Sequence, residues 1–289
     1  MKLCSKKGRY TASVRNILQG FQIASPEDTI EKIIKDQCSI TRFGDGEFDM
    51  ICHVGMKYQK YDSNLANRLK EVLNSNEENL LIGINNVIDL SYAEKYNDFA
   101  KKFWRKWLKD NKFKLLKILS KNKQYYSSNI TRFYIDYQDK SFVADYIRKL
   151  KKIWDKQDIV IIEGEQSRLG VGNDLFDNAS SIKRIICPSE DAFQFYHKIL
   201  KEALKVEKNK LIMLALGPTA TVLAYDLYKA GYRSIDIGHV DIEYEWFLRK
   251  ADKKIKIENK YVTEVADGRE NIQDIQDIKY ESEIIARVM

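Results

Sequence analysis

Four short runs of apolar, often β-branched residues in the second half of the sequence constrain the fold more than any other feature. The runs are DIVIIEG (158–164), IKRIICP (182–188), KLIMLALG (210–217) and RSIDIGH (233–239). Strands that are apolar on both faces occur in sheets covered on both sides, and such sheets are mostly parallel. The second half of the chain therefore predicts a buried parallel sheet.

Helical segments separate these strands. Residues 190–205 and 219–231 have the apolar spacing of helices, and the second segment ends at Gly231, a normal helix C-terminal residue. Strands that alternate with helices are typical of doubly wound α/β proteins. The predicted fold class is α/β, with a Rossmann-like, mostly parallel sheet flanked by helices.

The first half of the chain continues this alternation. Ser25 and Pro26 predict the start of a helix, because serine caps helices and proline suits the first turn. The predicted helices are 25–36, 63–75, most of 91–120, and 139–155, and the predicted strands are 38–43, 79–84 and 124–130. Three prolines and the absence of a linker-like stretch favour one domain over residues 1–289, with a helical insertion at about 90–155 and a C-terminal tail at about 255–289.

Composition limits the class of protein. The 289 residues are 44% hydrophobic and 31% charged, which is typical of a globular chain with a substantial core. No apolar run reaches the 18 or more residues of a membrane span, and the first residues lack a signal-peptide core, so we expect a cytoplasmic protein. None of the four cysteines forms a CxxC pair, which predicts free thiols, with Cys38 and Cys187 in the core.

The excess positive charge is concentrated in one segment. The net charge is +7, and residues 101–123 contain ten Lys or Arg and one acid, Asp110. The favoured interpretation is a helical pair with a solvated basic face. The alternative is peripheral contact with a membrane, an anionic polymer or a partner protein. Nucleic acid is not expected as a partner, because no recognition motif is present.

Polar segments follow the predicted strands at the edge where α/β sheets bind ligands. In TRFGDGEFD, Arg42 can neutralise phosphate, and Asp45 and Glu47 can bind a metal or hydroxyl groups, while Gly44 and Gly46 free the backbone to turn beside a ligand. The alternative is an ordinary turn with a helix-capping acid.

Two further segments suit a nucleotide or a sugar. The loop 163–177 is polar and contains Ser167, Arg168, Gly170, Gly172, Asn173 and Asp174. The turn at Gly217 and Pro218 precedes a helix whose free N–H groups can hold a phosphate, with Thr219 and Thr221 exposing hydroxyls. A structural loop and a well-capped helix are the alternatives. Neither a Walker motif nor GxGxxG is present, which argues against ATPase and NAD-dependent enzymes.

The fourth segment, DIGHVDIEYEW, combines acids with one of only three histidines. If the chain stays extended there, His239, Asp241 and Glu243 point to one face; if a helix begins at 241, Asp241 and Glu245 share a face instead. Either arrangement can present oxygen ligands to Mg²⁺ or Mn²⁺. The alternative is an acid-rich helix start favoured by the helix dipole.

Four motifs in order resemble one family. RFGDGE, IIEGEQSRLGVGNDLFDNASSIKRIICPSEDAF, LALGPTA and DIGHVDIEYEWF are similar to the bacterial GT-D type glycosyltransferases, first catalogued as a domain of unknown function. The resemblance covers about residues 25–250. It implies a Rossmann-like fold, a UDP-sugar donor, a glycan or glycosylated protein acceptor, and a divalent metal, commonly manganese, held by an Asp-x-Glu motif. The family includes glucosyltransferases of serine-rich-repeat adhesin glycosylation, and relatives occur with surface polysaccharide synthesis.

Two Asp-x-Glu motifs compete for the metal, Asp45-Gly46-Glu47 and Asp241-Ile242-Glu243. We favour the second, with His239 as a further ligand, and assign Asp45 or Glu47 as the general base for the acceptor hydroxyl. The residues expected to bind the donor are Arg42, Gly44, Gly46, Ser167, Arg168, Asn173, Asp174, Gly217, Pro218 and Thr219. The alternatives are a phosphohydrolase or nucleotidyltransferase that uses the same carboxylates, and a non-catalytic subunit that binds sugar nucleotides.

Overall fold

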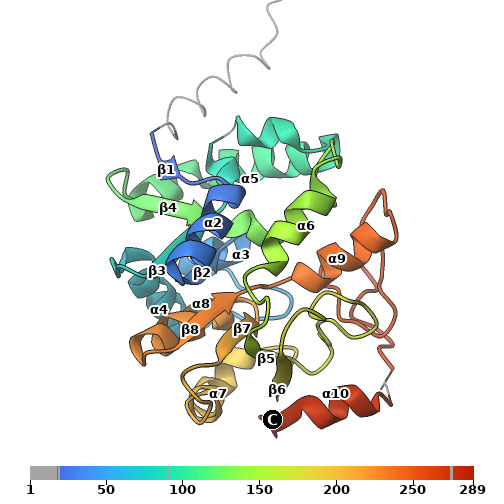
Figure 1. Ribbon diagram of the computed structural model, residues 1–289. Coiled ribbons are helices and arrows are strands. Elements are labelled where there is room, and N and C mark those ends of the chain that lie inside the picture. The colour runs from blue at the N-terminus through green and yellow to red at the C-terminus, as the bar shows by residue number, and fades with distance from the viewer. Residues whose placement is uncertain (1–17, 19, 90, 274–275) are drawn as a thin grey trace, which may run out of the picture.

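A computed structural model of the chain contains one nine-stranded sheet, with the order β1-β4-β3-β2-β8-β7-β5-β6-β9 (Figure 1). The structure describes residues 18, 20–89, 91–273 and 276–289. Every strand pair in it is parallel. The strands are β1 (Gln22–Ile23), β2 (Ser39–Phe43), β3 (Leu80–Ile84), β4 (Gln124–Ser127), β5 (Asp158–Gly164), β6 (Ser181–Cys187), β7 (Leu211–Ala215), β8 (Arg233–Asp236) and β9 (Ile284–Arg287). The predicted α/β class with a parallel sheet is confirmed.

Helices cover both faces of the sheet. The α-helices are α2 (Pro26–Asp36), α3 (Asp45–Ile51), α4 (Ser63–Asn74), α5 (Asp98–Ile118), α6 (Val143–Lys151), α7 (Tyr196–Ala203), α8 (Pro218–Lys229), α9 (Val240–Leu248) and α10 (Ile278–Glu283). Short 3₁₀ helices lie at η1 (Asn86–Ile88), η2 (Tyr92–Lys95), η3 (Ser128–Thr131) and η4 (Ala192–Phe195). One core packs against α4, α5, α7 and α8, and the other against α2, α6 and α9.

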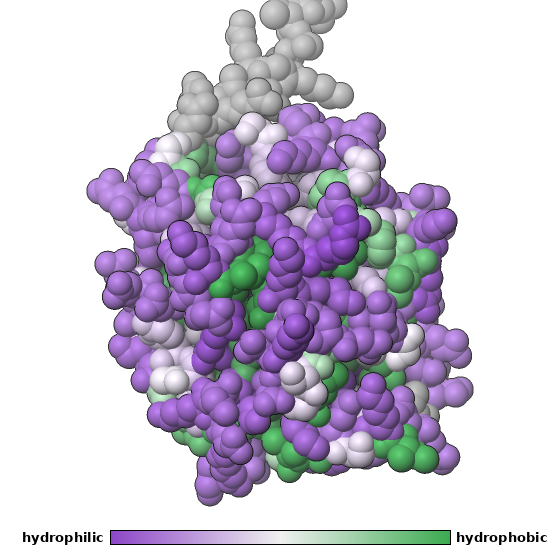
Figure 2. Space-filling view, in the orientation of Figure 1, coloured by the Kyte–Doolittle hydropathy of each residue, from purple (hydrophilic) through white to green (hydrophobic). Residues whose placement is uncertain are grey.

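Strand β5 shows why its sequence is continuously apolar. Val160 and Ile162 pack into the first core, and Ile159 and Ile161 pack into the second. Side chains alternate across a strand, so a strand with a core on each side needs apolar residues at every position. On the face shown in Figure 2, the surface is mostly hydrophilic, and hydrophobic residues form small separate patches.

The segment 90–155 contains α5 and α6, as predicted, and the predicted strand at 124–130 is present as β4, which pairs with β3 inside the sheet. The basic segment forms the single helix α5 followed by a turn, so the predicted helical pair is wrong. The C-terminal segment is also part of the sheet, because β9 pairs with β6.

Cysteine positions agree with the sequence as far as they are described. Cys38, Cys52 and Cys187 are free, and Cys38 and Cys187 are fully buried. Cys4 lies outside the described residues. Among the described helices, none is long and apolar enough to cross a membrane.

The order of the strands fixes where a ligand can bind. From β2, the chain moves outward to β3 and β4 on one side, while β8 and β7 lie on the other side. Ligands of open α/β sheets bind beyond the carboxyl ends of the strands, at the point where the strand order reverses. In this fold, that point lies between β2 and β8.

Candidate functional site

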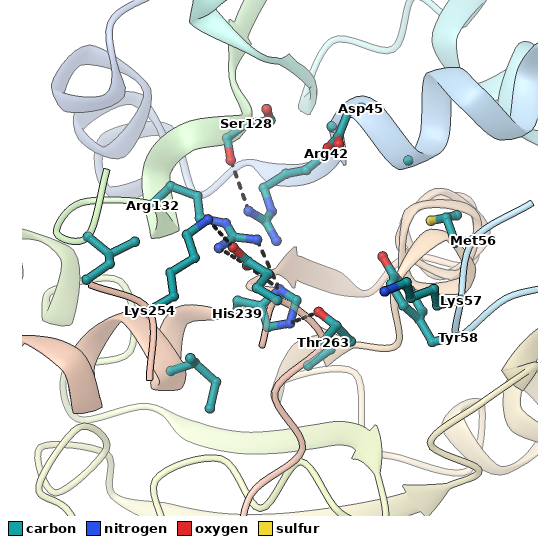
Figure 3. A pocket seen from close by; sticks show the side chains of 18 of the residues that line it. Arg42, Asp45, Met56, Lys57, Tyr58, Ser128, Arg132, His239, Lys254 and Thr263 are labelled. Atoms are coloured by element: carbon teal, nitrogen blue, oxygen red, sulfur yellow. Dashed lines mark hydrogen bonds and ion pairs between the residues drawn. The ribbon is translucent and has the colours of Figure 1, made fainter. Parts of the chain in front are cut away.

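A cavity of about 1270 Å³ opens at the carboxyl edge of the sheet, at this reversal point (Figure 3). Residues that follow seven different strands line it. They are Gly44 and Asp45 after β2, Asn85 after β3, Ser128 and Asn129 after β4, Gly164 at the end of β5, Pro188 and Ser189 after β6, Gly217 after β7, and Gly238 and His239 after β8. Each of the four polar segments predicted from the sequence contributes to this wall.

The first Asp-x-Glu motif lies at the start of α3. Gly44 caps this helix, and its N–H donates to Glu47 Oε2 at 2.7 Å. Asp45 and Glu47 both line the cavity, and neither forms an ion pair or receives a hydrogen bond from another side chain in the described part of the chain. Burial raises the pKa of Asp45 and raises that of Glu47 to about 7. Arg132 offsets this effect in part at Asp45. This wall therefore carries two carboxyl groups without an ion-pair partner among the described residues.

Arg42, which lines the cavity, connects β2 to η3 and to β8. Its Nη1 donates to Ser128 O at 2.9 Å and to Thr131 Oγ1 at 2.7 Å, and its Nη2 donates to Asp236 Oδ1 at 2.9 Å. A Cβ atom on Gly238 would lie 2.0 Å from Nη2, and Gly238 has φ +43°, so only glycine fits beside the guanidinium. The charge of Arg42 is thus already paired with Asp236.

A charged cluster that the sequence did not reveal forms another part of the wall. Arg132, from the turn after η3, makes ion pairs with Glu264, which also binds Lys254 (Figure 3). Arg132 Nη2 donates to His239 Nδ1 at 3.1 Å, and His239 Nε2 lies 3.1 Å from Thr263 Oγ1. Both ring nitrogens of His239 are therefore engaged.

The histidine is neutral at physiological pH. Burial, together with Arg132, lowers the pKa of His239 to about 4. The acid of the cluster behaves in the opposite way, because Arg132 and Lys254 hold the pKa of Glu264 well below its usual range despite burial. In this cluster Arg132 and Lys254 share Glu264, Arg132 also lies 3.6 Å from Glu243, and Lys254 lies 3.5 Å from Asp136. The two cations are therefore already paired with carboxyl groups, and the imidazole adds no charge to them.

The second Asp-x-Glu motif does not stay extended. Helix α9 begins at Val240, so of the two arrangements left open by the sequence the helical one is present, and His239, Asp241 and Glu243 do not share the single face of an extended chain. Asp241 and Glu245 share a face, but Lys260 already occupies it: Lys260 Nζ lies 2.7 Å from Asp241 Oδ2 and 3.1 Å from Glu245 Oε1.

Backbone and amide groups complete the neutralisation of Asp241. Gly170 N and Asn173 Nδ2 each donate to Asp241 Oδ1 at 2.8 Å. Glu243 faces elsewhere: its Oε2 accepts the N–H groups of Tyr134 at 2.9 Å and Ile135 at 3.1 Å. Asp241 touches the cavity, whereas Glu243 is fully buried and does not line it. Among the described residues, no group of three or more His, Cys, Asp or Glu is placed to hold a metal ion.

Residues expected to bind the donor divide into two groups. Arg42, Gly44, Gly46, Ser167 and Gly217 line the cavity. Arg168, Asn173, Asp174, Pro218 and Thr219 do not.

The loop residues outside the cavity have structural partners. Arg168 Nη1 donates to Asn259 O at 2.9 Å, and Asp174 accepts a hydrogen bond from Tyr244 at 2.6 Å. Asn173 joins Asp241 to Glu245. A direct contact between these side chains and a donor would require the loop to move.

Gly217 leaves the cavity open at the start of α8. It has φ +53°, and a Cβ atom there would lie 2.7 Å from Cε2 of Tyr58, another lining residue. Pro218 and Thr219 lie behind it in the buried first turn of α8, and within the described chain Thr219 Oγ1 has no hydrogen-bond partner. The helix start therefore reaches the cavity through Gly217.

Sequence reasoning missed Arg132, Lys254 and Glu264. Arg132 carried a usable signal, because a basic residue directly after the predicted strand 124–130 belongs at the same edge of the sheet. Lys254 and Glu264 follow α9 in a segment without regular secondary structure, which crosses back over the site. No periodicity marks such residues.

Comparison with known proteins agrees with this architecture. The family model "Glycosyltransferase GT-D fold" matches residues 40–265. A probable glycosyl transferase Gly of Streptococcus gordonii is 41% identical over 92% of this chain, and glycosyltransferase GlyD of Streptococcus pneumoniae is 38% identical over 93%. The chain spans only 39% and 33% of the lengths of these two relatives.

Solved structures extend the similarity to nearly the whole chain. One, described as domain of unknown function 1792 with a distinct glycosyltransferase fold, has a TM-score of 0.91 and 37% identity, and covers 97% of this chain and 100% of its own. Another, described as a new glycosyltransferase from Streptococcus sanguinis, has a TM-score of 0.88 and 38% identity, and covers 93% of this chain and 100% of its own.

Proposed function

This chain belongs to the family of glycosyltransferases with the GT-D fold, and we propose that it moves a sugar from a UDP-sugar to a glycan or glycoprotein acceptor with the help of Mn²⁺ or Mg²⁺. One observation carries the proposal. At the reversal point of the sheet, a single cavity combines two carboxylates that lack a cationic partner with a wall that holds Arg132 and Lys254. A diphosphate needs cationic groups, and a divalent metal needs carboxylates.

The metal fits Asp45-Gly46-Glu47 better than Asp241-Ile242-Glu243. Protein-bound Mg²⁺ usually takes one or two carboxylates together with phosphate oxygens and water, so a cluster of three protein ligands is not required. Asp45 and Glu47 offer one or two such carboxylates, and their burial without an ion-pair partner among the described residues favours a cation beside them. Asp241 would first have to lose Lys260. We therefore propose that one carboxylate of the Asp45–Glu47 pair would hold the ion, which would offset charge on the departing diphosphate.

The donor phosphates are proposed to lie between Gly217 and the Arg132–Lys254 side of the cavity. Helix α8 begins at Pro218, so its free N–H groups and its dipole favour an anion near Gly217. Arg132 and Lys254 line the same cavity, and they would have to share their charge between the anion and their present partners Glu264, Glu243 and Asp136. Because Gly217 has no side chain, the ring of Tyr58 can pack directly against it beside this region.

An acceptor hydroxyl must lose a proton as it attacks the sugar. Whichever of Asp45 and Glu47 does not contact the ion is placed to accept that proton. His239 is a weaker candidate, because both of its nitrogens are already hydrogen-bonded. Steady-state kinetics of variants at the two positions can therefore separate metal binding from proton acceptance.

A UDP-sugar hydrolysis assay tests the proposal. A panel of nucleotide sugars is screened with Mn²⁺, after EDTA, and after Mn²⁺ is restored, and the released product is identified. We expect UDP as the product, loss of activity on chelation, and recovery with Mn²⁺. Thermal shift with UDP and Mn²⁺ should give a raised melting temperature by mass action.

Other products would point to other functions. Inorganic phosphate or pyrophosphate in place of UDP indicates a phosphohydrolase or a nucleotidyltransferase. UDP binding without turnover of any donor indicates a non-catalytic subunit. Full activity in EDTA contradicts the metal role, and a weakened Mn²⁺ requirement in Asp45→Asn with an unchanged one in Glu47→Gln assigns the ion to Asp45.

A further inference from the structure

Helix α5 exposes three large aromatic side chains, of which Phe113 lies outside the cavity of the proposed reaction. Phe99, Phe103 and Phe113 are 76%, 45% and 63% exposed, respectively. The same helix also has a buried side, formed by Ala100, Trp104, Leu108 and Leu115. The fold therefore buries one apolar side of α5 and leaves a second set of large apolar groups in contact with solvent.

The three phenylalanines share one face. An α-helix turns about 100° per residue, so Phe99, Phe103 and Phe113 lie within roughly 80° of one another around the axis. Lys102, Lys106, Lys114 and Lys117 fall within about 20° of the same arc, and so does one acid, Asp110. All eight side chains are on the exposed side of the helix.

The charge on this face is positive. Helix α5 contains eight Lys or Arg and two Asp. Lys106 is paired with Asp110 at 2.8 Å, whereas no ion pair of Lys102 or Lys117 is found within the described residues. Exposed aromatic rings among lysines are suited to the interface of an anionic bilayer, where rings enter the acyl boundary and ammonium groups meet lipid phosphates.

We propose that this face of α5 docks the protein on the surface of an anionic lipid bilayer. The contact is peripheral, since none of the described helices can span a membrane. Phe99 and Phe103 also line the catalytic cavity, so docking would bring its mouth close to the lipid surface. The proposal concerns a surface, and it holds or fails independently of the donor and metal assignments.

Vesicle co-sedimentation tests the docking. The full chain is mixed with vesicles of phosphatidylcholine alone, or of phosphatidylcholine with phosphatidylglycerol. We expect binding to the anionic vesicles only. Each lysine near a bilayer contributes enough attraction that Lys102→Gln with Lys117→Gln should weaken binding roughly 25-fold. Loss of buried ring surface in Phe113→Ala should weaken it roughly fivefold.

Helix α10 supplies a matched control at the opposite end of the molecule (Figure 1). Ile278 is 89% exposed and lies next to Lys279, which is also exposed. Ile278→Ala with Lys279→Gln should leave vesicle binding unchanged. Circular dichroism checks the fold of every variant, and UDP-sugar hydrolysis without vesicles should be the same for Phe113→Ala and the parent chain.

Three outcomes overturn the proposal. The first is no binding to either vesicle, and the second is an equal loss in the α10 control. The third is binding that depends on the lysines but not on Phe113, with equal affinity for a soluble polyanion such as heparin, which would make the face a purely electrostatic surface.

Discussion

The two Asp-x-Glu motifs of this chain have nearly the same setting in sequence and opposite settings in space. Each follows a strand of the parallel sheet, and each opens a helix at the carboxyl edge. Asp45 and Glu47 face the cavity without a cationic partner, whereas Asp241 is bound by Lys260 and Glu243 is bound by backbone N–H groups.

This difference separates a reactive pair of carboxylates from a structural pair. Asp241 is a buried carboxylate with hydrogen bonds to both oxygens and an ion pair, so it is stabilised as it stands, and removing it leaves its partners buried without compensation. Glu243 is bound through Oε2 alone, since within the described residues its Oε1 has no hydrogen-bond partner. When a buried carboxyl group lacks these partners, its ionised form is destabilised until a cation binds. We therefore expect substitutions in the second motif to lower stability and substitutions in the first motif to lower activity.

Removing Asp241 should give the largest change in stability. Asp241→Ala leaves the buried Lys260 ammonium with Glu245 alone and deprives Gly170 and Asn173 of an acceptor. Breaking such a buried pair typically costs about 3–5 kcal/mol. Urea denaturation measures the change, and the matched variant Asp45→Ala should change stability by less than about 1 kcal/mol. Equal losses in both variants would remove the contrast.

Removing the charge of Asp45 should give the largest change in activity. Asp45→Asn is expected to lower turnover roughly 100- to 1,000-fold, because an electrostatic contact to the reacting groups or the metal is lost. Steady-state UDP release, measured across Mn²⁺ concentrations, reports both turnover and metal affinity. Turnover within twofold of the parent chain would place the metal-binding pair elsewhere.

A double substitution tests whether Lys260 is the reason why Asp241 is structural. Asp241→Asn with Lys260→Met removes both charges and keeps an acceptor for Gly170 N–H. The double variant should be more stable than the sum of its single changes predicts, by about 1–3 kcal/mol of coupling. Additive single changes would show that the two side chains do not depend on each other.

Glu243 should show the smallest effect. Glu243→Gln keeps an oxygen that can accept the Tyr134 and Ile135 N–H groups but loses the charge near Arg132, 3.6 Å away. We expect a loss of about 1–2 kcal/mol in unfolding free energy. The Mn²⁺ dependence of UDP release should not change, and a weakened dependence would restore Glu243 as a metal ligand.

The order of helices and strands could be predicted because the spacing of apolar residues within each segment indicates its type. Apolar residues at every position marked β5 and β7, and the Ser25–Pro26 pair marked the start of α2. Strands β1 and β9 escaped prediction because two and four residues at a sheet edge are too short to show a period.

The sequence by itself determined that polar turns meet at the carboxyl edge of a parallel sheet, since strand direction and turn residues are local properties. Tertiary structure alone decided which acidic side chains have partners that neutralise them. The partners that neutralise the second motif come from 19 residues away for Lys260, 71 for Gly170 and 109 for Tyr134. An acid becomes a ligand or a structural anchor according to the groups that packing places beside it, and those groups are distant in sequence.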